Sequence, residues 1–358
     1  MSILDSITGI FGGNSIDKMV GVDIGSSSIK LIQLSKKKDI PVLDTFGELS
    51  LSIYLKKEVG EIVDPTTDEL ADALKNLIKE TQVDTKNTAF AIPLKNTLMF
   101  NLKLPKVISK DKIGDTVMME ARKYIPVPLS EVEIDWSILP SINQEETEFY
   151  DVLVISIHKN TLNKYVTIAE KLGLNVKFLE VEVFSTVRAI LHYERDSVII
   201  VDMGSSMTKI YIVNNSIIRK THIINIGSSK ILKQLGQQKS HLSKDSDISN
   251  ETATLLREMK MRKDGVPVNL VRITNEIKKT IFEFQRENHA DIDTMLITGG
   301  GIVFDQVRDY LEKELSVQVQ VSDPFSKVDN PAYLDAALKK VGPEFAVAIG
   351  LALRGLSS

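Results

Sequence analysis

Two short segments of the sequence place an aspartate near the end of an apolar run, followed by glycine and serine. The first reads Val20-Gly21-Val22-Asp23-Ile24-Gly25-Ser26-Ser27-Ser28, and the second reads Ile199-Ile200-Val201-Asp202-Met203-Gly204-Ser205-Ser206. A tight turn of this composition presents backbone N–H groups and hydroxyls that can hold phosphate oxygens. The two aspartates suit a hydrated Mg²⁺, which prefers carboxylate and phosphate oxygens and keeps several waters. The predicted phosphate-binding residues are Asp23, Gly25, Ser26, Ser27, Ser28, Lys30, Asp202, Gly204, Ser205 and Ser206, with Mg²⁺ held through water by Asp23 and Asp202.

Either turn alone is a weak signal, because most turns of this kind are plain hairpin connections. Its recurrence, each time with a Lys and an Ile soon after, strengthens the prediction. The repeat is about half the chain long, too long for a solenoid unit, and it favours two related domains facing each other. A cleft between the domains is then the natural ligand site, and Lys30 could neutralise phosphates from the strand that follows the first turn.

A third glycine-rich turn follows another apolar strand. Met295-Leu296-Ile297-Thr298 leads into Gly299, Gly300 and Gly301, before a helix expected over 304–315. Bare backbone at this point lets a flat base or a ribose lie close to the chain. A glycine run before a helix can also be a linker or a cap, so its place after two phosphate-type turns is what makes it informative.

The elements that must position these turns alternate between strand and helix, as in α/β folds. Short alternating strands with one helix interrupt the pattern over 96–157 and predict an inserted α+β subdomain. The expected strands are 19–24, 29–34, 88–93, 97–104, 133–139, 150–157, 176–180 and 197–202, and the expected helices are 68–80, 160–172 and 183–193.

Composition removes several classes of function. Lys plus Arg number 44 against 48 Asp plus Glu in 358 residues, so nucleic acid is an unlikely main partner. The chain has no cysteine, which excludes disulfide and thiolate chemistry, and its five histidines lack metal-ligand spacing. We expect neither a signal peptide nor a membrane span, and we expect residues 1–17 to form an N-terminal tail with one apolar helical stripe.

The three turns in this order resemble the ATPase core shared by actin, heat-shock chaperones, sugar kinases and FtsA. Residues 179–189 and 345–353 resemble the two connecting helices of that core, and Ala348 and Gly350 would let these helices cross closely. The resemblance implies ATP and Mg²⁺ as ligands. It also implies an actin-like, ribonuclease H-like duplicated fold of two domains.

Within this superfamily the chain resembles the PilM family over essentially its whole length. The segments that carry the resemblance are 20–30, 121–132, 299–301 and 346–355. It implies an inserted α+β subdomain of the FtsA type in the first domain. The implied division is tail 1–17, subdomain 1A 18–95 and 160–195, inserted subdomain 1C 96–159, subdomain 2A 196–227 and 294–358, and subdomain 2B 228–293. In the inserted subdomain, Tyr124, Ile125 and two prolines are expected to form a stiff apolar edge.

The resemblance also implies a function. The chain would be a cytoplasmic, ATP-binding scaffold or switch in the inner-membrane assembly of a type IV pilus or of a related secretion system, attached to the inner membrane through its partners. Its main partner would be the N-terminal cytoplasmic tail of a PilN-like membrane protein, bound near subdomains 1A and 1C. Pilus motor ATPases and the inner-membrane platform protein are further expected partners. The alternatives are a small-metabolite kinase of the same superfamily and a filament-forming protein like FtsA.

Two departures from the family pattern concern the adenosine-binding part, for which the expected residues are Gly227, Arg257, Gly299, Gly300 and Gly301. Gly227 keeps one glycine of a Gly-Gly-Asp loop, and Arg257 keeps a cation where relatives show a glutamate and a lysine. Hydrolysis needs a residue that orients the attacking water. Glu182 is the candidate catalytic residue and Glu180 competes with it, so we expect slow or no ATP hydrolysis.

Overall fold

The computed structural model describes residues 16–57, 62–140, 148–192, 197–231, 233–234, 266–288, 290–302 and 305–357. The expected N-terminal tail lies outside these residues except for its last two positions, and Arg257 lies outside them as well.

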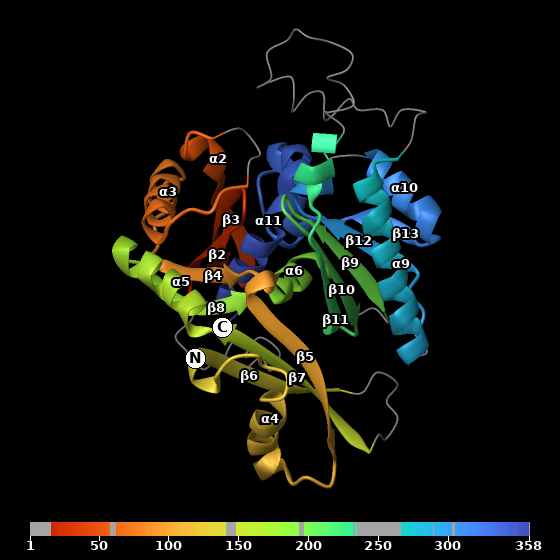
Figure 1. Ribbon diagram of the computed structural model, residues 1–358. Coiled ribbons are helices and arrows are strands. Elements are labelled where there is room, and N and C mark those ends of the chain that lie inside the picture. The colour runs from red at the N-terminus through yellow and green to blue at the C-terminus, as the bar shows by residue number, and fades with distance from the viewer. Residues whose placement is uncertain are drawn as a thin grey trace.

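Two five-stranded sheets form the upper part of the molecule, and they share one topology (Figure 1). Three strands form an antiparallel meander, a fourth strand joins the first strand of the meander in parallel, and a fifth joins the fourth in parallel. The first sheet has the order β3-β2-β1-β4-β8, with β1 Lys18–Ile24, β2 Ser28–Lys37, β3 Ile40–Ser50, β4 Asn87–Ile92 and β8 Asn175–Val181. The second has the order β11-β10-β9-β12-β13, with β9 Val198–Met203, β10 Thr208–Asn214, β11 Ile217–Ile224, β12 Thr294–Thr298 and β13 Gln318–Val321.

Helices cover both sheets. The first domain has α2 Leu51–Tyr54, α3 Thr67–Glu80, α5 Lys159–Leu172 and α6 Glu182–Ile190, and the second has α9 Val268–Asn288, α10 Asp305–Leu315 and α11 Asp335–Leu356. Helix α3 shows why such a segment folds: Thr66 caps it in a capping box with Glu69, and its buried face carries Leu70, Leu74 and Leu77 at helical spacing. Helix α11 packs against α6 and against β1, β2 and β4 of the first sheet.

The crossing of α6 and α11 requires a glycine. A Cβ on Gly350 would lie 1.9 Å from the carbonyl oxygen of Ser185, so a larger residue cannot occupy this position without moving a helix. This confirms the predicted close crossing at Gly350. Ala348 instead places its carbonyl oxygen where a Cβ on Gly21 of β1 would stand, at 2.0 Å.

Two ranges are expected for the first connecting helix, 183–193 from the apolar pattern and 179–189 from the resemblance, and α6 is shorter than either. Residues up to Val181 continue the parallel ladder between β8 and β4, so the helix begins only at Glu182. The helix ends at Ile190, one residue after the range implied by the resemblance and before Tyr193, the end expected from the pattern. At this end the ammonium of Lys327 donates to the carbonyl oxygens of Arg188 and Leu191. A cation at this end favours the carbonyl ends of a helix.

The inserted subdomain lies below the two large sheets (Figure 1). Its sheet has the order β5-β7-β6, with β5 Thr97–Pro105, β6 Val132–Leu139 and β7 Phe149–His158, and α4 Ile113–Ala121 packs against it. The three expected strands are therefore confirmed. Of the expected apolar edge, Ile125 is buried in this subdomain's own core, whereas Tyr124 is 54% exposed and stacks on Phe100.

Candidate functional site

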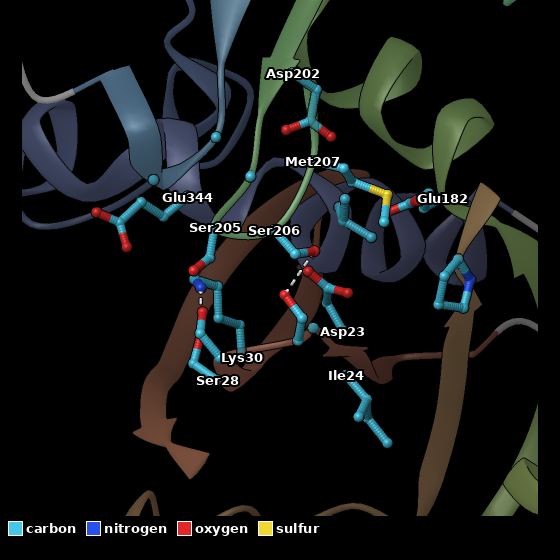
Figure 2. A pocket seen from close by; sticks show the side chains of 18 of the residues that line it. Asp23, Ile24, Ser28, Lys30, Glu182, Asp202, Ser205, Ser206, Met207 and Glu344 are labelled. Atoms are coloured by element: carbon cyan, nitrogen blue, oxygen red, sulfur yellow. Dashed lines mark hydrogen bonds between the residues drawn. The ribbon is translucent and has the colours of Figure 1, made fainter. Parts of the chain in front are cut away.

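A pocket of about 760 Å³ opens between the two large domains. This volume is typical of sites for small molecules. Figure 2 shows Asp23 and Asp202 in this pocket, each on a strand of a different domain. Of the residues predicted from the sequence, it is lined by Asp23, Gly25, Ser26, Ser27, Ser28, Lys30, Glu182, Asp202, Gly204, Ser205, Ser206, Gly299 and Gly300.

The two serine turns have the same construction. In the first, the Gly25 N–H donates to the carbonyl of Ser28 at 2.9 Å, and in the second the Gly204 N–H donates to the carbonyl of Met207 at 3.0 Å. The turns also touch each other, because the hydroxyl of Ser26 donates to the hydroxyl of Ser206 at 3.0 Å (Figure 2). One pair of hydroxyls thus joins the two domains at the pocket.

The strand that follows each turn brings a lysine opposite the aspartate. The ladders pair Asp23 with Lys30 and Asp202 with Lys209. Lys30 donates to the hydroxyl of Ser28 at 2.7 Å and forms an ion pair with Glu48 at 2.9 Å. The two lysines therefore share a register and differ in their surroundings, since Lys209 faces the carboxylates described next.

Lys209 is almost completely buried between carboxylates of both domains. Its Nζ lies 2.8 Å from Oδ2 of Asp202 in its own domain and 2.6 Å from Oε2 of Glu182, the first residue of α6 in the other domain. Burial opposes the charge of this ammonium, but the carboxylates of Asp202 and Glu182 outweigh burial and hold the pKa of Lys209 well above its usual value.

Asp23, unlike Lys209, lies where its charged form is disfavoured. Burial and the nearby carboxylate of Glu182 raise the pKa of Asp23 to about 6, although Lys30 opposes the shift. Ionised Asp23 is thus held at an energetic cost in the ligand-free protein. A bound cation beside it would relieve this cost.

Glu182 is held at both oxygens. Its Oε1 accepts the backbone N–H of Leu94 at 2.7 Å, while Oε2 accepts from Lys209. The competing candidate, Glu180, is fully buried and does not line the pocket. It binds Arg188 of α6 through two bonds of 2.8 Å and Arg354 of α11 at 2.9 Å. Glu180 therefore ties the two connecting helices together.

The triple-glycine loop approaches the second turn closely. Gly299 has a φ of 92°, and a Cβ there would lie 2.6 Å from Oδ1 of Asp202. Gly300 faces the side chain of Glu344 at the pocket. Gly301 and Gly227 do not line the pocket: a Cβ on Gly301 would meet the side chain of Met203, and one on Gly227 would lie 2.3 Å from the carbonyl oxygen of Ser205. Both support the second turn from behind.

Sequence reasoning missed several charged lining residues, of which Lys209, Glu48 and Glu344 are the most prominent. Lys209 could have been found from the sequence, because it follows Asp202 by the same number of residues as Lys30 follows Asp23. Glu48 and Glu344 could not have been found in this way, because neither belongs to a glycine-rich motif. Burial and the neighbouring Glu48 raise the pKa of Glu344.

The donor set fits Mg²⁺ unequally. The Asp23 carboxylate faces the pocket and can serve a hydrated cation. Asp202 is already engaged, because its Oδ2 accepts from Lys209 and, at 3.3 Å, from the hydroxyl of Tyr211. Over the described part of the chain, no three His, Asp or Glu side chains form a group that could hold a metal ion. The assignment of Mg²⁺ to both aspartates stays a prediction.

Comparison with solved structures places the fold. The chain resembles the PilM–PilN type IV pilus biogenesis complex with a TM-score of 0.77 and 21% identity, covering 96% of this chain and 99% of the other. It also resembles the ethanolamine utilization protein EutJ from Carboxydothermus hydrogenoformans, with a TM-score of 0.50 and 16% identity over 97% and 93% of the two chains. The fold is thus the predicted actin-like one.

None of the helices within the described ranges has the length and apolar character needed to cross a bilayer. The family model of the type IV pilus assembly protein PilM matches residues 21–356, nearly the whole chain. The matched residues include the duplicated turns, the residues that form the cleft between the domains, and the inserted subdomain. The chain therefore belongs to the PilM family of type IV pilus assembly proteins.

Proposed function

We propose that this chain binds ATP in its interdomain cleft and uses the nucleotide to set the angle between its two domains. The observation that carries the proposal is the contact of the two serine turns through Ser26 and Ser206, with Asp23 beside them. Phosphates that enter between the turns would bind hydroxyls and N–H groups of both domains at once. Gly299 and Gly300 would receive the adenosine. Mg²⁺ would accompany the phosphates on the side of Asp23.

Turnover is proposed to be slow or absent. A water-orienting carboxylate needs a free oxygen near the terminal phosphate. Both oxygens of Glu182 are engaged, one by Leu94 N–H and one by Lys209. Glu182 would thus contribute to the shape and charge of the cleft more than to catalysis.

The partner we propose is the N-terminal cytoplasmic tail of a PilN-like membrane protein, bound near subdomains 1A and 1C. Family membership and the likeness to a PilM–PilN complex support it. Such a partner would attach the protein, from the cytoplasm, to the inner-membrane platform protein and the motor ATPases of the pilus. A contact between the inserted subdomain and the second domain would transmit the effect of the nucleotide to the partner site. In this contact the side-chain amide of Asn101 on β5 donates to the carbonyl oxygen of Arg219 on β11 at 3.1 Å.

Calorimetry tests the proposal in two steps. ATP should bind the wild-type protein and should not bind the Asp23→Asn variant. A synthetic peptide of the tail should bind with different affinity in the presence and absence of ATP, because linked sites must change each other's affinity by the same factor. The Asp23→Asn variant should bind the peptide without any effect of ATP. Peptide binding that is identical with and without saturating ATP in the wild type would contradict the switch, and failure to bind ATP would refute the cleft.

A further inference from the structure

Lys209 connects the two domains at the floor of the cleft. It lies on β10 of the second domain, it is 9% exposed, and its ammonium bonds both Asp202 of its own domain and Glu182 on α6 of the first. The hydroxyl of Tyr211 completes the surroundings by donating to the same oxygen of Asp202. The arrangement is a buried bridge in which one cation holds two carboxylates.

The carboxylates around this bridge favour a cation between them. Asp23, Glu182 and Asp202 all line the pocket, and the charges of Glu182 and Asp202 both act on Asp23. Three carboxylates in a partly buried space repel one another strongly unless cations lie between them. Lys209 is the cation in direct contact with two of them.

The equivalent lysine of the first domain provides an internal comparison. Lys30 occupies the same ladder position relative to Asp23, but its ammonium bonds Glu48 and Ser28 of its own domain. It does not contact a carboxylate of the other domain among the ion pairs of the described residues. The two lysines thus share a ladder position, but only Lys209 has a carboxylate of the other domain, Glu182, in direct contact, whereas the charge of Glu344 on α11 acts on Lys30 without an ion pair.

We propose that Lys209 is a resident cation of the cleft, which performs at Asp202 and Glu182 the charge balancing that a divalent cation would otherwise perform. The inference rests on the proposed nucleotide function and deepens it. With the ammonium already in place, ATP needs little help from a divalent cation on this side of the cleft. The same bridge withholds Glu182 from any water beside the terminal phosphate.

The first experiment compares ATP binding in excess Mg²⁺ with ATP binding in excess EDTA, by calorimetry. For the wild type, the two dissociation constants should differ by no more than about tenfold, and this difference is the contribution of the cation proposed beside Asp23. The Lys209→Met variant, which keeps the length of the side chain and loses its charge, should lose more than about a hundredfold in affinity when EDTA replaces Mg²⁺. Lys209→Arg should restore the weak dependence, because it restores a cation. Lys30→Met should weaken binding by a similar factor in both media.

The second experiment uses no nucleotide and so separates this inference from the proposed function. Mn²⁺ alone, followed by electron paramagnetic resonance, should bind the Lys209→Met variant more tightly than the wild type by at least about tenfold. Adding Glu182→Gln to that variant should abolish the gain. A protein that binds no ATP in either medium refutes the proposed function, and the Mn²⁺ result then decides this inference.

Three results would overturn the role of Lys209. One is a wild type whose ATP affinity falls in EDTA as steeply as that of the Met variant. Another is a wild type that binds Mn²⁺ as tightly as the Met variant. If the Met variant does not fold, the wild type and the Arg variant still decide, and a loss of more than about a hundredfold in EDTA for both would refute the proposal.

Discussion

Replacing Asp23 by asparagine should stabilise the ligand-free protein while it removes nucleotide binding. The pKa of Asp23 is raised from 3.8 to about 6, so the folded protein binds this proton more tightly than the unfolded chain does. The stabilisation that the proton gives is fully present below the unfolded pKa and is lost as pH rises through about 6. Above pH 6 the ionised carboxylate therefore lowers the free energy of unfolding, whereas the neutral amide of asparagine does not.

The size of the effect follows from the shift. A shift of roughly two pKa units corresponds to about 3 kcal/mol, and partial access to solvent reduces this to about 1–3 kcal/mol. Urea unfolding near pH 7.5 should therefore show the Asp23→Asn variant to be more stable than the wild type by that amount, and the difference should shrink as pH falls below 6 toward 4. The exposed Asp291→Asn serves as the matched control and should change the free energy of unfolding by less than about 0.5 kcal/mol at every pH.

Two results would refute this reasoning about Asp23. A variant less stable than the wild type near pH 7.5 would mean that the carboxylate is held by favourable bonds in the absence of ligand. A stability difference that does not change with pH would mean that the amide acts through packing and not through charge. A stabilised variant that still binds ATP would leave the electrostatics intact and refute the proposed role in binding.

Three further predictions concern the frame of the cleft. Glu180→Gln should lower the free energy of unfolding in urea by about 3–5 kcal/mol, because it leaves the buried guanidinium of Arg354 without its carboxylate. An unchanged urea midpoint would mean that this ion pair does not hold the connecting helices together. Gly350→Ala should lower the melting temperature far more than Gly114→Ala, whose added Cβ would have one ordinary contact, at 3.5 Å from Trp136. Equal melting temperatures for the two variants would mean that the helices can separate to admit the methyl group. Gly299→Ala should abolish ATP binding in calorimetry, because its Cβ would displace the neighbouring aspartate, and unimpaired binding would contradict the tight loop.

Local patterns in the sequence predict the strands that lead into the two serine turns, the turns themselves and the two aspartates. The turn after Asp23 and the turn after Asp202 have the same internal bond from a glycine N–H to a carbonyl three residues on, and this geometry depends only on neighbouring residues. The strands β3, β10, β11 and β13 and the helix α9 have no counterpart among the elements expected from the sequence, although the structure contains all of them. The turn between the first two strands of each meander joins strands that pair directly with each other, which is why the turn can be predicted from neighbouring residues.

Pairings between distant residues could not be predicted. Lys209 meets Glu182 only because the two domains face each other, and nothing near either residue in the sequence signals the other. Glu180 and Glu182 look equivalent as carboxylates two positions apart. Their surroundings differ because β8 ends between them and α6 begins. Glu180 therefore lies at the interface of the two connecting helices, and Glu182 lies in the cleft.

Glycines present a related limit. A glycine at positions 227 and 301 indicates that the backbone of Gly227 and of Gly301 approaches another group closely. The sequence does not indicate whether that group belongs to a ligand or to the protein itself. At both positions it is the protein, namely the second serine turn and the residues before it. Gly299 and Gly300, by contrast, reach the pocket.

The place of α11 has a consequence for the order in which the protein acquires its fold during synthesis. The core of the first domain contains Met19, Val22 and Leu31 from the beginning of the chain together with Phe345, Ile349 and Leu351 of α11. The ribosome must therefore make almost the entire sequence before the first sheet can cover its inner face. Until then the growing chain exposes an apolar surface that chaperones can bind and that can misassemble, so the first domain can complete its core only after the second domain has been synthesised.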